Sequence, residues 1–325
     1  MTLTLTARAE HWPLRTPFRI SRGVKDAADV VVVEARDGAH VGAGECVPYA
    51  RYGESTEGVL AEIAALPQGI APDSLQLLMH PGAARNAIDC ALWDLRAKRE
   101  ARSVASLLGL DESTRVATAV TVSLDTPERM AEAAAKLVGA PLLKVKVNAD
   151  HPLEAIEAVA AAAPQAALIV DPNESWSFAL LAEIELDLSR LNVALIEQPL
   201  PQGEDDALEG FVPAVPICAD ESAHVSADLE RVAARYQAVN IKLDKSGGLT
   251  EALAMQRRAR ELGLKIMVGC MVCTSLSIAP AMLLAQSADF VDLDGPWWLK
   301  TDRAEAFAFD VGWMTPLVSG WGKPA

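Results

Sequence analysis

The sequence is poor in aromatic residues and in positive charge. Phe, Trp and Tyr make up 5% of its 325 residues, and 29 Lys and Arg stand against 44 Asp and Glu, which gives a formal net charge of −15. Phosphate contacts need a basic face, so we expect no nucleic-acid partner. The low aromatic content also disfavours a surface built for stacking on bases or sugars.

Long apolar runs and a complete cysteine pattern are also missing. No run reaches the ~18 apolar residues of a membrane helix, and residues 1–10 lack the features of a secretory signal. We therefore expect a cytoplasmic protein without a membrane partner. Cys270 and Cys273 have C-x-x-C spacing, but no second pair completes a zinc site, so we interpret the five cysteines as small buried residues.

Apolar residues are abundant, at 51% of the chain, so a large core can form. Residues 2–9 and 28–35 are typical of strands, residues 38–44 of a hairpin turn, and residues 81–102 of a long helix with one apolar stripe. This mixture predicts an N-terminal α+β domain over residues 1–115.

From residue 116 onward, short apolar runs alternate with Ala-rich amphipathic stretches. Strands alternating with helices predict a parallel α/β sheet, and eight such units predict a closed barrel over residues 116–295. An open doubly wound sheet is the alternative. Residues 296–325 are expected to return to the first domain. The eight runs are 116–124, 142–147, 166–171, 193–197, 215–220, 238–243, 265–270 and 290–294.

Charged residues lie at or near the C-terminal ends of these predicted strands. In a barrel these ends form the active-site face, and spacings of 22 to 26 residues predict about one charged group per unit around one cavity. The residues concerned are Lys144, Lys146, Asp171, Glu197, Asp220, Lys242, Asp292 and Asp294.

Two lysines share one face of the second predicted strand. Lys144 and Lys146 alternate with apolar residues, which must pack on the outer helices, so both lysines should point into the barrel. Burial is expected to lower their pKa, which suits a general base. The alternative is a solvated edge strand. Lys242 lies on a strand roughly opposite, so Lys146 and Lys242 suit a two-base reaction.

Three carboxylates end three successive strands. Asp171, Glu197 and Asp220 would repel one another unless a cation neutralised them, and their hard oxygen atoms suit Mg²⁺. A divalent ion can hold a substrate carboxylate and stabilise the enediolate formed when the adjacent carbon loses its proton. The alternative is that these acids cap the helices that follow.

The ordered motifs resemble those of the enolase superfamily, in the muconate-lactonising-enzyme subgroup, and the resemblance covers the whole chain. It implies a modified (β/α)7β TIM-type barrel with an α+β capping domain. The matching motifs are Lys144-Val145-Lys146, Asp171-Pro172-Asn173, Glu197-Gln198-Pro199, Ala219-Asp220-Glu221-Ser222 and Asn240-Ile241-Lys242 followed by Gly247-Gly248.

The resemblance implies roles for these residues. Asp171, Glu197 and Asp220 would bind one Mg²⁺ per subunit, and Lys146 and Lys242 would be the acid/base pair. It implies that Lys144 is a supporting cation, which lowers the pKa of Lys146 and helps to hold the substrate carboxylate. Lys245 is a rival to Lys242, but it lies an odd number of residues away, so strand parity disfavours it.

The last predicted strand resembles that of the dipeptide epimerases. There the aspartates matching Asp292 and Asp294 bind the free ammonium of a dipeptide; the alternative is that they are solvated loop acids. The segment 269–275 also resembles these epimerases, but it has Cys273 where the subgroup commonly has Glu. Further substrate contacts are expected from Ser123, Cys270 and Met271.

Two loop segments, 17–23 and 48–53, are expected to recognise the substrate side chain. Their arginines suit an acidic side chain, because guanidinium pairs bidentately with carboxylate, and Arg22 is the first candidate. The expected reaction is therefore a Mg²⁺-dependent inversion of the C-terminal α-carbon of L-Ala-L-Glu, a dipeptide of bacterial cell-wall peptides, to give L-Ala-D-Glu.

Other functions fit parts of this pattern. Within the subgroup they are N-acylamino acid racemisation, muconate cycloisomerisation and o-succinylbenzoate synthesis, whose substrates carry no free ammonium. A Schiff-base lysine aldolase would need no metal, and a non-catalytic barrel would have no use for two opposed lysines. Apart from a small-molecule substrate, a symmetric homo-oligomer is the partner compatible with such a barrel.

Overall fold

The computed structural model describes residues 3–67, 69–111 and 115–324, and its strands form three sheets. The largest sheet carries β5 to β12 in sequence order, and all its neighbouring strands run parallel. Its ends meet where the Ala119 N–H donates to the Val291 carbonyl at 2.8 Å, so the sheet is a nearly closed barrel. The predicted barrel is confirmed, and the open-sheet alternative is wrong.

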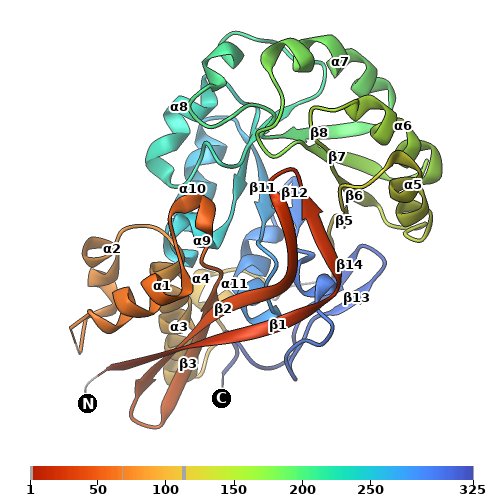
Figure 1. Ribbon diagram of the computed structural model, residues 1–325. Coiled ribbons are helices and arrows are strands. Elements are labelled where there is room, and N and C mark those ends of the chain that lie inside the picture. Colours follow the sequence, from red (N-terminus) through yellow and green to blue (C-terminus); the bar gives the residue numbers. More distant parts are fainter. Residues whose placement is uncertain (1–2, 68, 112–114, 325) are drawn as a thin grey trace.

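Helices surround the barrel on its outer face (Figure 1). Two 3-10 turns, η3 (Asp205–Leu208) and η5 (Gly295–Trp298), follow β8 and β12. The barrel strands are β5 (Val120–Val122), β6 (Leu142–Lys146), β7 (Ala167–Asp171), β8 (Val193–Glu197), β9 (Ile217–Ala219), β10 (Ala238–Ile241), β11 (Lys265–Gly269) and β12 (Phe290–Asp292). The helices that accompany them are α5 (Pro127–Ala135), α6 (Pro152–Ala162), α7 (Phe178–Arg190), α8 (Leu229–Ala233), α9 (Leu243–Ser246), α10 (Leu249–Glu261) and α11 (Ser275–Ala285).

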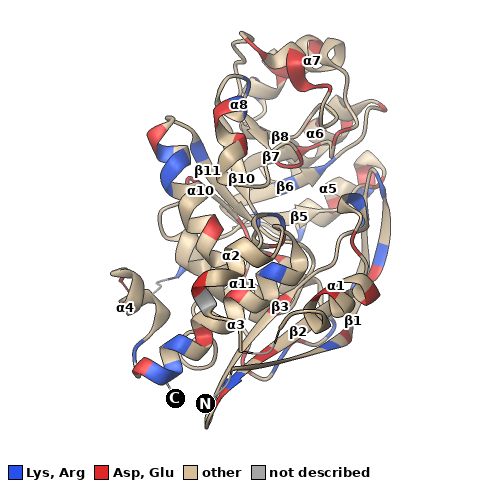
Figure 2. Cartoon of the chain, turned by 90° about the vertical axis from the view of Figure 1, so that its left-hand side faces the viewer, with Lys and Arg blue, Asp and Glu red and all other residues tan. Residues whose placement is uncertain are grey.

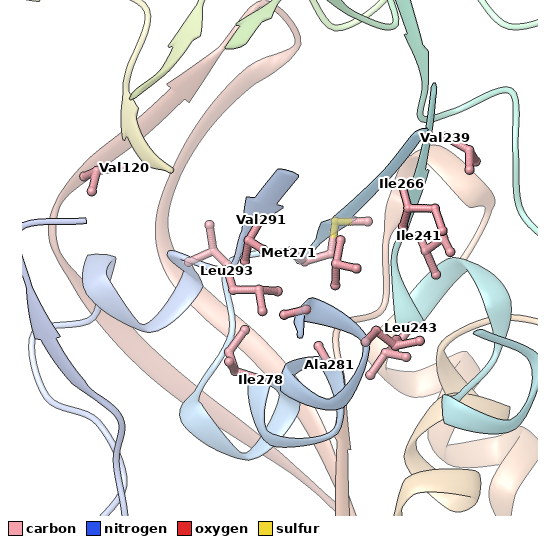
Figure 3. Close-up of a cluster of buried hydrophobic side chains, with 14 of the residues drawn as sticks. Val120, Val239, Ile241, Leu243, Ile266, Met271, Ile278, Ala281, Val291 and Leu293 are labelled. Carbon is pink, nitrogen blue, oxygen red and sulfur yellow. The ribbon is translucent and has the colours of Figure 1, made fainter. Parts of the chain in front are cut away.

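The barrel has one apolar layer inside and a larger apolar core outside. The inner layer consists of Ala119, Ile169, Leu195, Cys218, Ala238 and Met267. Because side chains alternate along a strand, residues two positions further on point to the same interior. Asp171, Glu197 and Asp220 each lie two residues beyond a member of this layer, so they form a charged layer above it. Figure 3 shows part of the outer core, to which β10, β11, β12 and α11 all contribute buried apolar side chains.

The N-terminal domain is an antiparallel sheet covered by helices. Its strands are β1 (Thr4–Ile20), β2 (Gly23–Asp37) and β3 (His40–Cys46), and its helices are α1 (Thr56–Ala64), α2 (Leu75–Leu78), α3 (Ala83–Glu100) and α4 (Val104–Leu108), with the 3-10 turn η1 (Ala50–Tyr52). Gly42 and Gly44 let α3 approach β3 closely, because a Cβ on either would lie 2.1 Å from an α3 carbonyl. This close packing accounts for the Gly-x-Gly pattern of β3.

Strand β1 is longer than the predicted strand 2–9. It continues past Pro13 to Ile20, with a shift in its pairing to β2 between Pro13 and Phe18. The β1–β2 hairpin therefore reaches the barrel, where the Ser21 hydroxyl donates to the Pro172 carbonyl at 3.2 Å. Figure 1 shows this long hairpin in red.

The C-terminal segment forms a small third sheet and contacts the N-terminal domain. Strands β13 (Ala308–Asp310) and β14 (Trp313–Thr315) pair with β4 (Val116–Ala117). The Trp321 indole then donates to the Cys90 carbonyl of α3 at 3.1 Å. The helices of the described ranges include none long and apolar enough to cross a membrane. Basic and acidic residues are interspersed over the face seen in Figure 2.

Candidate active site

Strand β6 carries two lysines into the barrel, as strand parity predicts. Lys144 is 2% exposed and Lys146 is 6% exposed, while Leu143, Val145 and Val147 of opposite parity belong to the outer core. The interpretation as a solvated edge strand is therefore wrong.

Lys144 lies at the centre of the charged layer. Its Nζ is 2.6 Å from Glu197 Oε2, 2.7 Å from Asp292 Oδ2 and 3.1 Å from Asp171 Oδ2. One ammonium group thus contacts carboxylates from three different strand ends. Four of the residues predicted to form the site therefore lie together.

The two predicted bases lie on strands that are four positions apart in the eight-stranded order, so they face each other across the barrel. Lys146 Nζ donates to Asp171 Oδ2 at 2.5 Å and to Asn173 Oδ1 at 3.2 Å. Lys242 Nζ donates to Asp220 Oδ2 at 2.6 Å and lies 4.0 Å from Glu197 Oε1. Each lysine is therefore held by a carboxylate on its own side of the cavity.

The lowering of the lysine pKa by burial that was expected on the second strand is not found for Lys144, and the pKa of Lys242, directly after β10, is raised as well. Burial acts to lower both pKa values, but neighbouring carboxylates outweigh it and raise them, led by Asp292 for Lys144 and by Asp220 for Lys242. The same attraction from Lys146 and Lys144 lowers the pKa of Asp171 against the effect of its burial. Burial and the nearby Asp171 raise the pKa of Glu197 to about 7.

The three carboxylates have the donor chemistry of a site for a hard divalent cation. All three are buried, and their oxygen atoms face lysines that a competing cation could displace. Within residues 3–67, 69–111 and 115–324, no three His, Cys, Asp or Glu side chains are already grouped to hold a metal ion. Metal binding would therefore require the lysine ammonium groups to move from between the carboxylates.

Neighbouring side chains support these carboxylates from behind. Asn240 Nδ2 donates to Glu197 Oε1 at 2.8 Å. Lys245 Nζ donates to the Asp220 Oδ1 at 2.6 Å and to the Asp220 carbonyl at 2.5 Å. Lys242 lines the cavity and its rival Lys245 does not, but strand parity could not predict the contact of Lys245 with Asp220, because β10 ends at Ile241 and Lys245 lies on the helical turn α9.

Asp292 is the last residue of β12, and Asp294 lies just beyond it at the start of η5. Asp292 Oδ1 is buried and has no hydrogen-bond partner among the described residues. Asp294 Oδ2 accepts hydrogen bonds from the Thr121 N–H at 2.8 Å and from the Trp298 indole at 3.1 Å. Burial and the nearby Asp292 raise the pKa of Asp294 to about 6. The solvated-acid interpretation is wrong, because the two are 4% and 6% exposed.

A cavity of about 470 Å³ lies above the charged layer. Of the predicted residues, it is lined by Arg22, Lys144, Lys146, Asp220, Lys242, Cys270, Met271, Asp292 and Asp294. Asp171 and Glu197 lie beneath these side chains. Ser123 does not line the cavity, and its Oγ accepts a hydrogen bond from the Arg19 N–H at 3.4 Å.

Cys273, which replaces the Glu of the subgroup, is fully buried beside the turn η5. A Cβ on Gly295 would lie 2.9 Å from its Sγ, so the two residues fit closely together. The structure therefore has a thiol and a glycine at this position, and the support of the carboxylates comes from Asn240 and Lys245 instead.

The tip of the β1–β2 hairpin, which extends the predicted segment 17–23 to residues 17–25, and the loop 48–53 cover the cavity, and we call these two segments the capping loops. Arg22 donates to Glu221 Oε1 at 2.7 Å and to Glu174 Oε2 at 2.9 Å. Arg51 binds both oxygens of Glu174, at 2.9 and 3.0 Å. Both guanidinium groups are therefore bound to carboxylates of the barrel, and the role expected for Arg22 in reading the substrate stays a prediction.

Lys25 is a cavity residue that the sequence patterns did not single out. Its ammonium lies 5.0 Å from the centre of the Tyr49 ring, and among the described cations that line the cavity it is the one without an ion pair. Its place follows from the β1–β2 pairing, in which Lys25 faces Phe18. To identify Lys25 as a cavity residue from the sequence, we would have had to predict the full length of the β1–β2 hairpin.

Two family models match the chain. Residues 2–109 match the model described as "Mandelate racemase / muconate lactonizing enzyme, N-terminal domain", and residues 128–322 match "Enolase C-terminal domain-like". The chain is 48% identical to the L-Ala-D/L-Glu epimerase of Escherichia coli (strain K12), over 95% of this chain and 98% of the relative. It is 46% identical to an N-acetyl-D-glutamate racemase of Pseudoalteromonas sp, over 90% and 95%.

Solved structures of similar proteins include bound dipeptides. An enolase family member from Agrobacterium tumefaciens with homology to dipeptide epimerases, with bound sodium and L-Ala-L-Glu, has a TM-score of 0.93 and 46% identity and covers 97% of this chain and 98% of its own. A dipeptide epimerase from Cytophaga hutchinsonii, complexed with Mg and D-Ala-L-Val, has a TM-score of 0.91 and 27% identity and covers 99% and 95%.

Proposed function

The chain belongs to the mandelate racemase / muconate lactonizing enzyme family and is an isomerase of amino acid derivatives, and we propose that it epimerises L-Ala-L-Glu at the α-carbon of the Glu residue. The observation that carries this proposal is that Lys146 and Lys242 oppose each other across a cavity that also presents Asp292 and Asp294. Such a cavity offers an acid/base group to each face of one carbon and a negative site to a substrate ammonium.

In the proposed reaction, the two lysines work in opposite protonation states. The α-carbon lies between them; the neutral amine of one removes the α-proton, and the ammonium of the other delivers a proton to the opposite face. Asp292 and Asp294 bind the N-terminal ammonium of the dipeptide by charge-assisted hydrogen bonds. The two lysines exchange roles when the D-epimer is the substrate.

We propose that Asp171, Glu197 and Asp220 hold one Mg²⁺, as their donor chemistry and Mg-containing relatives suggest. When bound, this ion supplies positive charge that fixes the substrate carboxylate, favours the negative charge developing there, and lowers the pKa of nearby lysines. Lys146 and Lys242 then do the proton transfer, and Lys144 balances the remaining carboxylate charge.

For the acidic side chain of the substrate, we propose Lys25 as the reader. Arg22 and Arg51 are bound to Glu174 and Glu221, whereas the ammonium of Lys25 is free to pair with a carboxylate in the cavity. The long flexible side chain of lysine suits a reach from the hairpin into the cavity.

A second candidate is racemisation of N-acyl-glutamate, favoured by the similarity to the Pseudoalteromonas racemase. That substrate has the same acidic side chain but no ammonium, so it would not use the charge of Asp292 and Asp294. Because Asp292 and Asp294 both line the cavity, we propose the dipeptide rather than N-acyl-glutamate as the substrate.

Proton NMR in D₂O tests the proposal. With Mg²⁺ present, the α-proton signal of the Glu residue of L-Ala-L-Glu should disappear by exchange and the L,D-epimer should appear, whereas EDTA should stop both changes. N-acetyl-L-glutamate is the matched comparison without an ammonium. Exchange of N-acetyl-glutamate alone would establish the second candidate, and exchange of neither compound would refute both. Activity in EDTA with a borohydride-trapped lysine would instead support the Schiff-base aldolase.

A further inference from the structure

Glu174 lies in the loop after β7, where the backbone turns toward the capping domain. Asn173 and Glu174 both have left-handed φ angles, 48° and 68°. The Glu174 N–H donates to the Gln198 carbonyl at 2.9 Å, which fixes this turn against the next strand end. The turn directs the Glu174 side chain out of the barrel and toward the two capping loops.

The Glu174 carboxylate is the meeting point of both capping loops. Its side chain is 8% exposed. Arg51 donates to both of its oxygens in a bidentate pair, and Arg22 donates to Oε2 at 2.9 Å. The Gln202 N–H donates to Oε1 at 2.8 Å. Four donors from three parts of the chain thus converge on one carboxylate, which is a geometrically specific arrangement.

The same turn also carries residues of the reaction site. Asp171 and Asn173 both accept from Lys146, while the carbonyl of Asn173 accepts from Arg22 at 3.1 Å. The capping loops therefore bind the same turn whose Asp171 and Asn173 side chains hold Lys146, and they are linked to Lys146 through this turn.

We propose that Glu174 is a positioning residue that holds both capping loops on the barrel and keeps Arg51 and, together with Glu221, Arg22 from binding the substrate. The consequence is that Lys25 is left as the cation that recognises an acidic side chain. Glu174 thereby sets the charge selectivity of the cavity without touching the substrate. The part that concerns selectivity rests on the proposed function, whereas the holding of the loops does not.

Hydrogen–deuterium exchange measured by mass spectrometry tests the holding of the loops without any substrate. In Glu174→Gln, faster deuterium uptake is expected in both segments, 17–25 and 48–53. Glu183→Gln, on the exposed face of α7, is the matched control and should leave both segments unchanged. If the Gln variant does not fold, Arg51→Gln removes the bidentate pair from the other side. Unchanged uptake in both segments would overturn the proposal.

Selectivity is tested by the ratio of kcat/KM for L-Ala-L-Glu to that for the nearly isosteric L-Ala-L-Gln. Lys25→Met should lower this ratio by about 10-fold, the lower end of the range for a charged hydrogen bond, because Lys25 is only partly buried. Adding Glu174→Gln to Lys25→Met should raise the ratio again, because Arg51 loses its carboxylate partner and becomes free for the acid, while Arg22 stays paired with Glu221. Adding the control substitution Glu183→Gln to Lys25→Met should leave the ratio unchanged.

A purely structural role for Glu174 would lower both kcat/KM values equally and leave their ratio unchanged, which would overturn the selectivity part. If neither dipeptide reacts, the ratio is taken with N-acetyl-L-glutamate and N-acetyl-L-glutamine. Failure of the proposed dipeptide reaction is thus distinguishable from failure of this inference, and the exchange experiment decides the holding of the loops in either case.

Discussion

The strand ends of the barrel and the capping loops both bring charged side chains to one cavity, but the charges are balanced in opposite ways. In the barrel, acidic groups such as Asp171 and Glu197 surround the central ammonium of Lys144. In the loops, the guanidinium groups of Arg22 and Arg51 surround the carboxylate of Glu174.

This difference suggests a division of labour. The barrel side chains are fixed by rigid parallel strands, which suits proton transfer, because small displacements of a base are costly to the rate. The loop side chains are fixed to the barrel by ion pairs between long side chains, and not by strand pairing. We therefore expect barrel substitutions to remove the reaction and loop substitutions to change which substrate is accepted.

The largest effect is expected from Lys242→Met, which removes one acid/base group from the barrel. Epimerisation should slow by about 10²–10⁴-fold, the usual contribution of general acid–base catalysis. The rate of appearance of the epimer by NMR measures it, with circular dichroism to show that the variant is folded. Lys136→Met, at an exposed position after α5, is the matched control. A Lys242→Met enzyme with full activity would remove Lys242 from the mechanism.

A smaller effect is expected from Asp294→Asn, which keeps an oxygen for the Thr121 N–H and the Trp298 indole but loses the charge. KM for L-Ala-L-Glu should rise by about 10–100-fold, the cost of a charged hydrogen bond, with a lesser change in kcat. N-acetyl-L-glutamate should not be affected in this way. Equal losses with both substrates would show that Asp294 supports the cavity rather than the ammonium.

The same aspartate gives a pH dependence. With its pKa raised to about 6, Asp294 is neutral below that pH and negative above it. KM for the dipeptide should therefore rise as the pH falls through 6, and Asp294→Asn should lose this dependence. Steady-state kinetics across this range, with N-acetyl-L-glutamate as the comparison, provides the test.

A still smaller effect is expected from Lys25→Met in the capping loops. Lys25→Met should reduce kcat/KM for L-Ala-L-Glu by about 10-fold while leaving L-Ala-L-Gln nearly unchanged, because only the charged pair is lost. Competition between the two dipeptides in one NMR tube measures the preference directly. An equal loss for both would mean that Lys25 acts on the hairpin and not on the substrate, and the contrast between barrel and loops would then fail.

The final expected effect is on stability and not on activity, at a carboxyl between the two domains. Asp244 of α9 accepts hydrogen bonds on Oδ1 from the Val47 N–H and from Asn86 Nδ2, both in the N-terminal domain, and burial raises its pKa to about 7. The folded protein therefore binds more protons than the unfolded chain between about pH 4 and 7, so this group lowers stability as the pH rises through that window.

Asp244→Asn keeps the oxygen and removes the charge. The variant should be more stable than the parent by roughly 1–3 kcal/mol at about pH 8 and nearly equal to it at about pH 4. Urea unfolding at both pH values measures the difference. A variant destabilised equally at both would show that the carboxylate is needed for the domain contact.

The barrel was predictable from sequence because strand geometry leaves little freedom. Once Ile169 is placed inside, alternation places Asp171 there too, and repetition of this relation in successive units brings the carboxylates together. The contact of Lys245 with Asp220 could not be predicted by the same rule, since a helical turn begins between Lys245 and Lys242. The alternation of side-chain direction applies only within a strand and not beyond its last residue.

The capping loops were less predictable, for two physical reasons. Pro13 and Pro17 are typical of strand ends, yet β1 passes them by shifting its register, so the long hairpin and Lys25 were missed. The partners of Arg22 and Arg51 lie more than 120 residues away, at Glu174 and Glu221. Ion pairs between loops leave no period in the sequence, so arginines suited to a substrate could not be told from arginines that bind the barrel.

The central claim is that two lysines act on opposite faces of one carbon. The most direct test is α-proton exchange in D₂O on pure L-Ala-L-Glu and pure L-Ala-D-Glu, with Lys146→Ala and Lys242→Ala. Each variant should exchange the α-proton of one epimer only, and the two variants should select opposite epimers, because each retains the base for one face. A variant that exchanges both epimers at similar rates would contradict the account.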